Sequence, residues 1–144
     1  QTNMDIGVRT VVHDTELDDI HALIRQLSSG AKLPDLASMN QMIAAEGFHF
    51  ITARESSKTI AMLSLVLFQI PTGLRARIED VVVLETHRRQ GIARRMSTIA
   101  IEQYKDSGAR TLDLTSSPSR AAANQLYVSL GFKQRETNVY RYTD

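Results

Sequence analysis

The spacing of apolar residues along the chain predicts where its helices lie. A first helix is capped by Asp14 or Thr15, ends at "SSG" (28–30), and carries apolar residues at helical spacing: Leu17, Ile20, Leu23, Ile24 and Leu27. A second helix begins at Pro34 and Asp35 and runs to about Glu46, ahead of Gly47. Two more are expected, one from about Ile92 to Gly108 and one over 121–130.

Segments rich in β-branched and aromatic residues predict the strands between these helices. "TIAMLSLVLFQI" is nearly all apolar, as in a strand buried on both faces. The strands are expected at 8–13, 48–54, 59–70, 75–84, 109–116 and 137–142. The order β-α-α-β-β-β-α-β-α-β predicts a mixed α/β fold in which helices cross between strands of a central sheet.

Composition limits the classes of function. The 144 residues suit one domain over 1–144, and no linker-like stretch divides them. The absence of cysteine excludes disulfides, thiolate metal sites and a cysteine nucleophile. A net charge of +1 gives no global attraction to nucleic acid. Four scattered histidines predict no metal site: His13, His21, His49 and His87. Neither a membrane span nor a signal peptide is recognisable, so we expect a cytoplasmic protein.

The stretch "ETHRRQGIARRM" (85–96) follows the apolar "VVVL" and reads as strand, turn and helix N-terminus. The first helical turn has free N–H groups and a partial positive charge. Gly91 lets an anion approach the backbone, and the arginines around it add charged donors. This arrangement favours a phosphate or pyrophosphate site, although a solvated basic turn is the alternative. The glycine patterns of Walker and dinucleotide loops are absent.

Two blocks of the sequence resemble the GCN5-related N-acetyltransferases. "RRQGIA" (88–93) matches the R/Q-x-x-G-x-G/A signature of that family, and "IEDVVV" resembles its fourth strand. "SRAAANQLYVSLGF" (119–132) is similar to its second conserved block. The resemblance covers about 76–142 and implies the GNAT fold, with a cleft where the fourth and fifth strands splay. It also implies transfer of acetyl from acetyl-CoA to a primary amine by direct attack in a ternary complex.

The resemblance also implies which residues bind the co-substrate. Backbone amides of the loop would hold the pyrophosphate, and the side chains of Arg88 and Arg94 would lie nearby. The loop residues concerned are Arg88, Arg89, Gln90, Gly91, Ile92, Ala93 and Arg94. Pantetheine would lie along Val81, Val82 and Val83. There Val81 and Val83 would offer main-chain hydrogen bonds, and an N–H near Val83 would polarise the thioester carbonyl. No metal is implied.

Tyr127 stands where the family often has a tyrosine that protonates the leaving thiolate, although an amphipathic core residue is the alternative. The usual asparagine, about seven residues earlier, is replaced by Arg120, which could instead reach a CoA phosphate. An asparagine occurs at Asn124, one turn before Tyr127. Asn124 either contacts pantetheine or is an exposed polar residue of the helix.

The attacking amine must lose a proton, and a carboxylate is the usual base. Glu79 is the first candidate for the base or for orienting the amine, and Asp80 is the second. Glu79 shares a face with Val81 and Val83 only if no bulge intervenes. A plain ion pair of Glu79 with Arg75 or Arg77 is the alternative.

The acceptor is left open as a small-molecule or peptide amine. A non-catalytic acyl-CoA-binding or regulatory module is the main rival, and a basic turn that binds a protein is a third hypothesis. Tyr140 and Tyr142 either line the acceptor pocket or pack on the sheet, while His49 and His87 are weak candidates for proton relays. We expect no nucleic-acid or membrane partner, and a homodimer is possible because family members often form one through their last strands.

Overall fold

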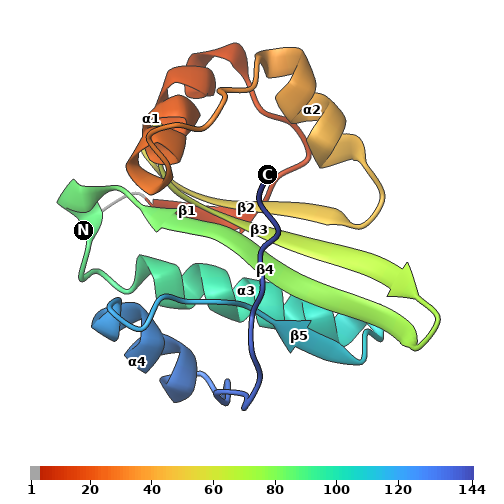
Figure 1. The fold of residues 1–144 in the computed structure, drawn as a ribbon. Coiled ribbons are helices and arrows are strands. Elements are labelled where there is room, and N and C mark those ends of the chain that lie inside the picture. Colours follow the sequence, from red (N-terminus) through yellow and green to blue (C-terminus); the bar gives the residue numbers. More distant parts are fainter. Residues whose placement is uncertain (1–3) are drawn as a thin grey trace.

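The computed structural model describes residues 4–144. A five-stranded sheet in the order β1-β2-β3-β4-β5 carries helices on both faces (Figure 1). The strands are β1 (Met4–Val8), β2 (Phe48–Glu55), β3 (Lys58–Ile70), β4 (Gly73–Val83) and β5 (Thr111–Asp113). The helices are α1 (Leu17–Leu27), α2 (Leu36–Ala44), α3 (Ile92–Ser107) and α4 (Ala121–Ser129), with short 3-10 helices η1 (Asp14–Glu16) and η2 (Glu85–His87). Neighbouring strands are antiparallel except β4 and β5, so the expected mixed α/β class is confirmed.

Two apolar cores lie on opposite faces of the sheet. On one face α3 packs Ile92, Met96 and Ala100 against β2, β3 and β4. On the other face α1 and α2 form the second core with residues of β2, β3 and β4: Ile20, Leu23, Met39, Ile43, Phe50, Met62 and Val82. Figure 1 shows α1 and α2 above the sheet and α3 and α4 below it. No helix within residues 4–144 is long and apolar enough to cross a membrane.

A buried carboxylate ties the N-terminal elements together. Glu16 is fully buried and accepts hydrogen bonds from Arg9 at 2.6 and 2.8 Å and from Thr59 Oγ1 at 3.0 Å. Its Oε2 also accepts the His13 N–H at 2.9 Å. Burial alone would raise the pKa of Glu16, but these hydrogen bonds and the charge of Arg9 lower it from 4.5 to about 2. The carboxylate therefore stays ionised in the folded protein.

The first strand differs from its expected position at 8–13. β1 is Met4–Val8, and the N–H of Arg9 adds one more hydrogen bond to Phe50 O, at 2.7 Å. Beyond it, the Asn40 side chain replaces a neighbouring strand, because its Oδ1 accepts from Val12 N and its Nδ2 donates to Val12 O. Of the segment 8–13, only Val8 belongs to a strand and only Val12 is buried.

The β3–β4 pairing contains a bulge, the feature on which the expected face of Glu79 depends. Met62 is opposite Val82 and Ser64 is opposite Glu79, so two residues of β4 stand opposite Leu63 alone. Asp80, the extra residue, has φ +52°. The insertion reverses the alternation of side chains. Ile78, Val81 and Val83 all pack on the α3 core, whereas Val82 packs on the α1–α2 core.

The C-terminal part of the sheet is shorter than the pattern predicts. β5 is only Thr111–Asp113, not 109–116, because its parallel pairing with β4 ends at Arg77 and Asp113. The expected strand at 137–142 is absent, and this segment runs past the sheet edge (Figure 1). Val139, Tyr140 and Tyr142 are 76%, 87% and 91% exposed. An alternating pattern forms a strand only where a neighbour offers hydrogen bonds, and the described chain gives this segment none.

Candidate active site

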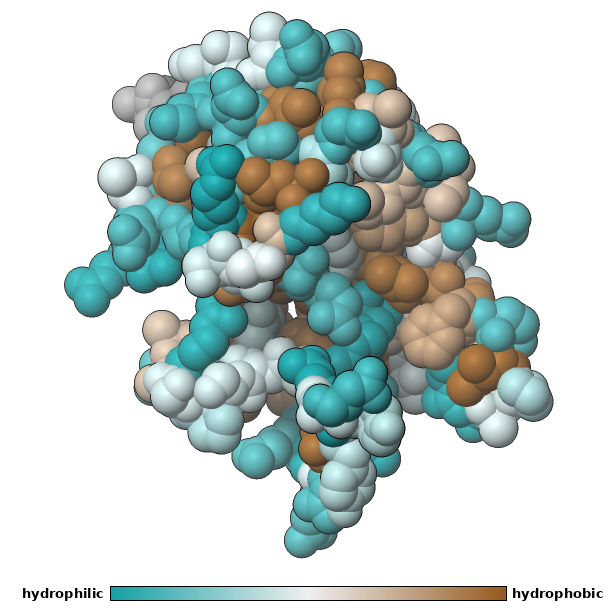
Figure 2. All heavy atoms as spheres, turned by 45° about the horizontal axis from the view of Figure 1, so that its top comes forward, coloured by the Kyte–Doolittle hydropathy of each residue, from teal (hydrophilic) through white to brown (hydrophobic). Residues whose placement is uncertain are grey.

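Past Asp113, β5 and β4 separate and leave a hollow of about 180 Å³, here called the cleft. It brings together residues from α1, β4, the segment after β5, and α4: Leu27, Ile78, Glu79, Asp80, Val81, Leu114, Thr115, Arg120 and Tyr127. Both candidate carboxylates and the candidate tyrosine therefore lie around one space. Figure 2, from the side of α1 and α2, shows a mainly hydrophilic surface that is hollowed near its centre.

The open edge of β4 faces the cleft. Leu84 N–H donates to Ile60 O of β3, at 2.8 Å. Successive residues of a strand direct their N–H and C=O groups to opposite sides, so the peptide groups of Val81 and Val83 point away from β3. These are the two residues expected to meet an extended substrate arm. That role stays a prediction, and Val82 instead pairs with Met62.

Gln26 of α1 reaches this edge. Its Nε2 donates to Val83 O at 2.8 Å, and its Oε1 accepts from Glu85 N at 3.2 Å. The Gln26 side chain therefore provides hydrogen-bond partners for backbone groups at the β4 edge, as a neighbouring strand would. Gln26 carries no sequence signal for this contact, since the helical pattern of α1 does not say which polar residue meets β4.

Glu79 and Asp80 differ in their surroundings. Both side chains are exposed, but Glu79 forms an ion pair with Arg77, as the alternative interpretation held. Because of the bulge it does not share the face of Val81 and Val83. Asp80 lies at the rim of the cleft, where withdrawal of its carboxyl group from water and the charge of Glu79 raise its pKa. A raised pKa makes Asp80 a better proton acceptor than an ordinary aspartate.

Tyr127 lies in the wall of the cleft and is 8% exposed. Its ring packs edge-on against Phe132, with centroids 5.8 Å apart, which fixes the ring at the end of α4. Burial raises the pKa of Tyr127, and the charge of Arg120 offsets part of that rise. The phenol is therefore protonated at neutral pH and can act as a donor. It belongs to the core and to the cleft wall at once.

Asn124 does not aim its amide donors at the cleft. Its Nδ2 donates to Ser117 O at 2.9 Å and to Arg120 O at 2.8 Å, and these bonds fasten the turn before α4. A contact of Asn124 with pantetheine stays a prediction. Only the side-chain oxygen of Asn124 could accept a hydrogen bond from pantetheine without breaking these two bonds. Arg120, by contrast, lines the cleft.

The loop 88–91 has the geometry of an anion cradle. Arg89 and Gly91 have φ of +65° and +73°, so the backbone turns twice through the left-handed region before α3 begins at Ile92. No side chain caps this helix end and no acidic residue lies in its first turn. A Cβ at Gly91 would meet no atom within 4 Å, so the space beside it is open. Free N–H groups and positive charge are thus unopposed there.

The side chains around the loop have separate roles. Ile92 is buried in the α3 core, so only its amide can serve an anion. Arg88, Arg89 and Gln90 are exposed, while Arg94 donates to Ser129 Oγ of α4. His87, just before the loop, bonds Glu55 Oε1 at 2.9 Å and ties η2 to the end of β2. Binding of a pyrophosphate by these residues stays a prediction.

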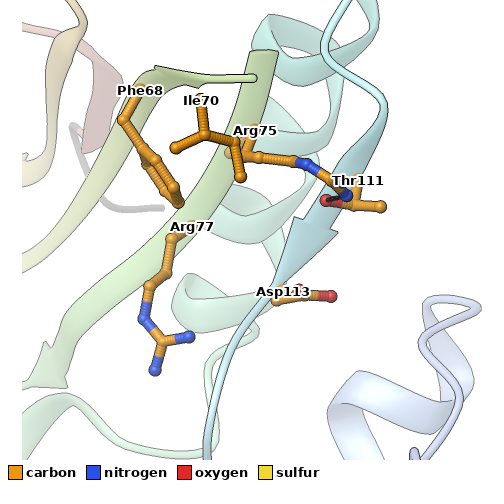
Figure 3. Close-up of a pocket in the computed structure, with 7 residues that line it drawn as sticks. Phe68, Ile70, Arg75, Arg77, Thr111 and Asp113 are labelled. Carbon is orange, nitrogen blue, oxygen red and sulfur yellow. Dashed lines mark hydrogen bonds between the residues drawn. The ribbon is translucent and has the colours of Figure 1, made fainter. Parts of the chain in front are cut away.

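A second hollow, of about 200 Å³, lies beside the cleft on the uncovered end of the sheet and is here called the open face (Figure 3). Its walls come from β3, β4 and β5: Phe68, Ile70, Arg75, Ala76, Arg77, Thr111 and Asp113. Arg77 connects the two hollows, because it lines the open face and pairs with Glu79 in the cleft. Tyr140 and Tyr142, expected near an acceptor pocket or in the sheet, contribute to neither hollow.

The chain was compared with known proteins. A model of the acetyltransferase (GNAT) family matches residues 17–132, whereas no curated protein matches. A solved acetyltransferase structure from Agrobacterium tumefaciens str. C58 is 24% identical, with a TM-score of 0.81 over 95% of this chain and 99% of that chain. An acetyltransferase from Trypanosoma brucei is 20% identical, with a TM-score of 0.81 over 98% and 100% of the two chains. The aminoglycoside N-acetyltransferase AAC(6')-Iy, solved with CoA, is 20% identical, with a TM-score of 0.79 over 99% and 96%.

Proposed function

Because the chain belongs to the acetyltransferase (GNAT) family, we propose that it transfers an acetyl group from acetyl-CoA to a primary amine by direct attack. The observation that carries the proposal is the meeting of two carboxylates, a protonated tyrosine and an open strand edge around one cleft. CoA is present in the solved structure of the similar AAC(6')-Iy. The acceptor we propose here is a small molecule or peptide that carries a primary amine.

The residues of the loop fit the diphosphate of CoA. The uncapped start of α3 offers amide donors, and Gly91 leaves their approach open. From there the free edge at Val81 and Val83 leads to the cleft, so an extended arm can bond to β4 as an added strand. The N–H of Val83 is the donor that we assign to the thioester oxygen as negative charge develops on it.

We assign removal of the ammonium proton to Asp80 and orientation of the amine to Glu79. An amine with a pKa near 10 arrives charged, and a carboxylate of raised pKa accepts its proton more readily than an ordinary one. The free amine attacks the thioester carbon, so a C–N bond forms and the C–S bond breaks. Tyr127 gives its proton to the departing thiolate, whose own pKa near 8.5 makes a donor useful. The nitrogen loses its second proton as the amide forms, and transfer of that proton through water restores the phenol of Tyr127.

An acceptor screen that follows free thiol release from acetyl-CoA tests the proposal. On an acceptor so found, Asp80→Asn is expected to lower kcat/KM by about 10²–10⁴ and Tyr127→Phe by about tenfold, because each removes a proton transfer. Thr98→Ala on the outer side of α3 is the control, since Thr98 only bonds Arg94 O in its own helix. Full activity in both variants would refute these roles. CoA binding without thiol release over a broad amine panel would indicate the non-catalytic module.

A further inference from the structure

The open face shares one side of the sheet with Glu79 and lies directly beside the cleft. Across β3 and β4, Phe68 is opposite Arg75 and Ser64 is opposite Glu79. Residues two apart on a strand point to the same side, so Arg75, Arg77 and Glu79 form one row along β4. Helices α1 and α2 cover the other end of this face and leave Phe68 and Ile70 41% and 38% exposed. A ligand at Glu79 can therefore extend along β4 over the open face.

The charges along this row change in a definite order. Asp80 and Glu79 are at the cleft, and Arg77 is neutralised by its ion pair with Glu79. Arg75, farther along, forms no ion pair with any described residue of 4–144. Among the described residues its guanidinium donates to two hydroxyl oxygens, Thr111 Oγ1 at 3.2 Å and Thr72 Oγ1 at 2.7 Å.

Asp113 also lines the open face, but Figure 3 shows its side chain pointing away from Arg77. Arg75 points across to Thr111 on β5 in the same view. A positive charge without a carboxylate partner thus lies at the far end, beside the apolar wall of Phe68 and Ile70. An anionic group can take the place of water on this guanidinium with charge-assisted hydrogen bonds.

From this order we propose that the acceptor is a linear primary amine that carries a carboxylate at its far end, such as a short extended peptide. The inference rests on the proposed function and adds the chemistry of its acceptor. The amine lies at Asp80 and Glu79, the spacer lies against Phe68 and Ile70, and the carboxylate binds Arg75. Arg75 and Glu79 are four residues apart on β4, or about 13 Å, so a peptide of about four residues fits and a free amino acid is too short.

A polycationic aminoglycoside fits this surface poorly. The cleft and the open face together carry three acidic and three basic side chains: Glu79, Asp80 and Asp113 against Arg75, Arg77 and Arg120. A ligand with several ammonium groups would place positive charge next to these arginines, and like charges at close range repel. The similar aminoglycoside N-acetyltransferase therefore gives the shape of the site but not its acceptor.

Calorimetry on protein saturated with CoA separates binding from turnover, because CoA carries no acetyl group to transfer. The probes are tetra-alanine, its C-terminal amide, alanine, and the aminoglycoside neamine. We expect tetra-alanine to bind about tenfold more tightly than its amide, since hydrogen bonds to charged groups contribute that much. Alanine and neamine are expected to bind more weakly than tetra-alanine.

Three variants localise the effect. Arg75→Gln is expected to abolish the preference for carboxylate over amide, and Arg75→Lys to keep part of it. Arg110→Gln is the matched control. The Arg110 guanidinium donates a hydrogen bond to the carbonyl oxygen of Thr72, but Arg110 does not line the open face. It should leave the preference unchanged. Arg75 is only half-buried, and thermal melting of each variant verifies that it is folded.

Several results would overturn the inference. They are equal affinity for tetra-alanine and its amide, a preference that survives Arg75→Gln, tightest binding of neamine, or no binding of any probe. A separate assay of thiol release distinguishes the two proposals. Tetra-alanine that binds through Arg75 but releases no thiol from acetyl-CoA contradicts the proposed reaction alone. Equal rates of thiol release with tetra-alanine and with its C-terminal amide would contradict the proposed acceptor chemistry alone.

Discussion

The two sides of the candidate active site are built in different ways. The proposed diphosphate site is one contiguous stretch, 85–96, in which a turn, a glycine and a helix start follow each other. The proposed acceptor side gathers single residues from β3, β4 and β5, which are up to 45 positions apart between Phe68 and Asp113. A contiguous site carries its geometry in local sequence, whereas the acceptor side depends on strand register. One side can therefore change without the other.

The largest expected effect concerns the scaffold that both sides share. Glu16→Gln removes a carboxylate whose pKa falls from 4.5 to about 2 on folding, and this should cost about 3 kcal/mol of unfolding free energy at pH 7. A lowered pKa stabilises the fold above about pH 4.5, and the contribution disappears as the pH falls through 2. Urea unfolding between pH 7 and 2 measures it. The exposed Glu46→Gln is the control, and an equal pH dependence in all three proteins would contradict the expectation.

The next effect separates the two sides. Gly91→Val places a side chain in the open space beside the helix start and should weaken CoA binding about tenfold to a hundredfold, through lost hydrogen bonds to the anion. Gly108→Val is the matched control, since Gly108 ends the same helix with φ +75° and equally open space. Both variants strain the backbone alike. Calorimetry with CoA that finds equal losses for the two would remove the case for a cradle at Gly91.

A smaller effect tests which carboxylate is the base. Glu79→Gln removes a negative charge that raises the pKa of Asp80, so the fall of kcat/KM on acidification should move to lower pH. The sign follows because the base works only when ionised, which requires a pH above its pKa. Asp113→Asn serves as control and should leave the profile in place. Complete loss of activity in Glu79→Gln would instead identify Glu79 as the base.

The smallest effect probes the place where α1 meets the co-substrate edge. Gln26→Ala frees Val83 O, which the Gln26 amide occupies at 2.8 Å. An amide of CoA that must displace the Gln26 side chain from Val83 O gains little net binding energy. Removing the Gln26 side chain should therefore tighten CoA binding about threefold. Weaker CoA binding would show that Gln26 stays on Val83 when CoA is bound. Gln41→Ala on the exposed side of α2 provides the comparison.

Much of the fold follows from local patterns. Strands β2 and β3 and the four helices lie close to their expected places, because burial on both faces and helical periodicity are properties of contiguous residues. β1 was misplaced because Asn40, distant in sequence, substitutes for a strand partner at Val12. The segment 137–142 has a strand-like pattern without a partner, and partnership is not a local property.

The candidate site likewise has parts that local sequence predicts and parts that depend on contacts between distant residues. The loop with Gly91 and the wall with Tyr127 were recognisable from short motifs. The separate surroundings of Glu79 and Asp80 were not, because they depend on where Leu63 stands opposite two residues. Gln26 and Arg75 were likewise out of reach. Their contacts join residues 57 and 36 positions apart, and no residue type marks them.

The single extra residue at position 80 makes β4 a strand with two phases. Upstream of it, even-numbered side chains enter the α3 core, and downstream the odd-numbered ones do. Deleting one residue there would turn Val81–Val83 over together and exchange their partners, whatever amino acid was lost. Length at this point is therefore constrained more strictly than identity. Selection for folding alone should therefore accept substitutions at position 80 and reject every one-residue deletion, whereas selection for activity should also retain Asp80.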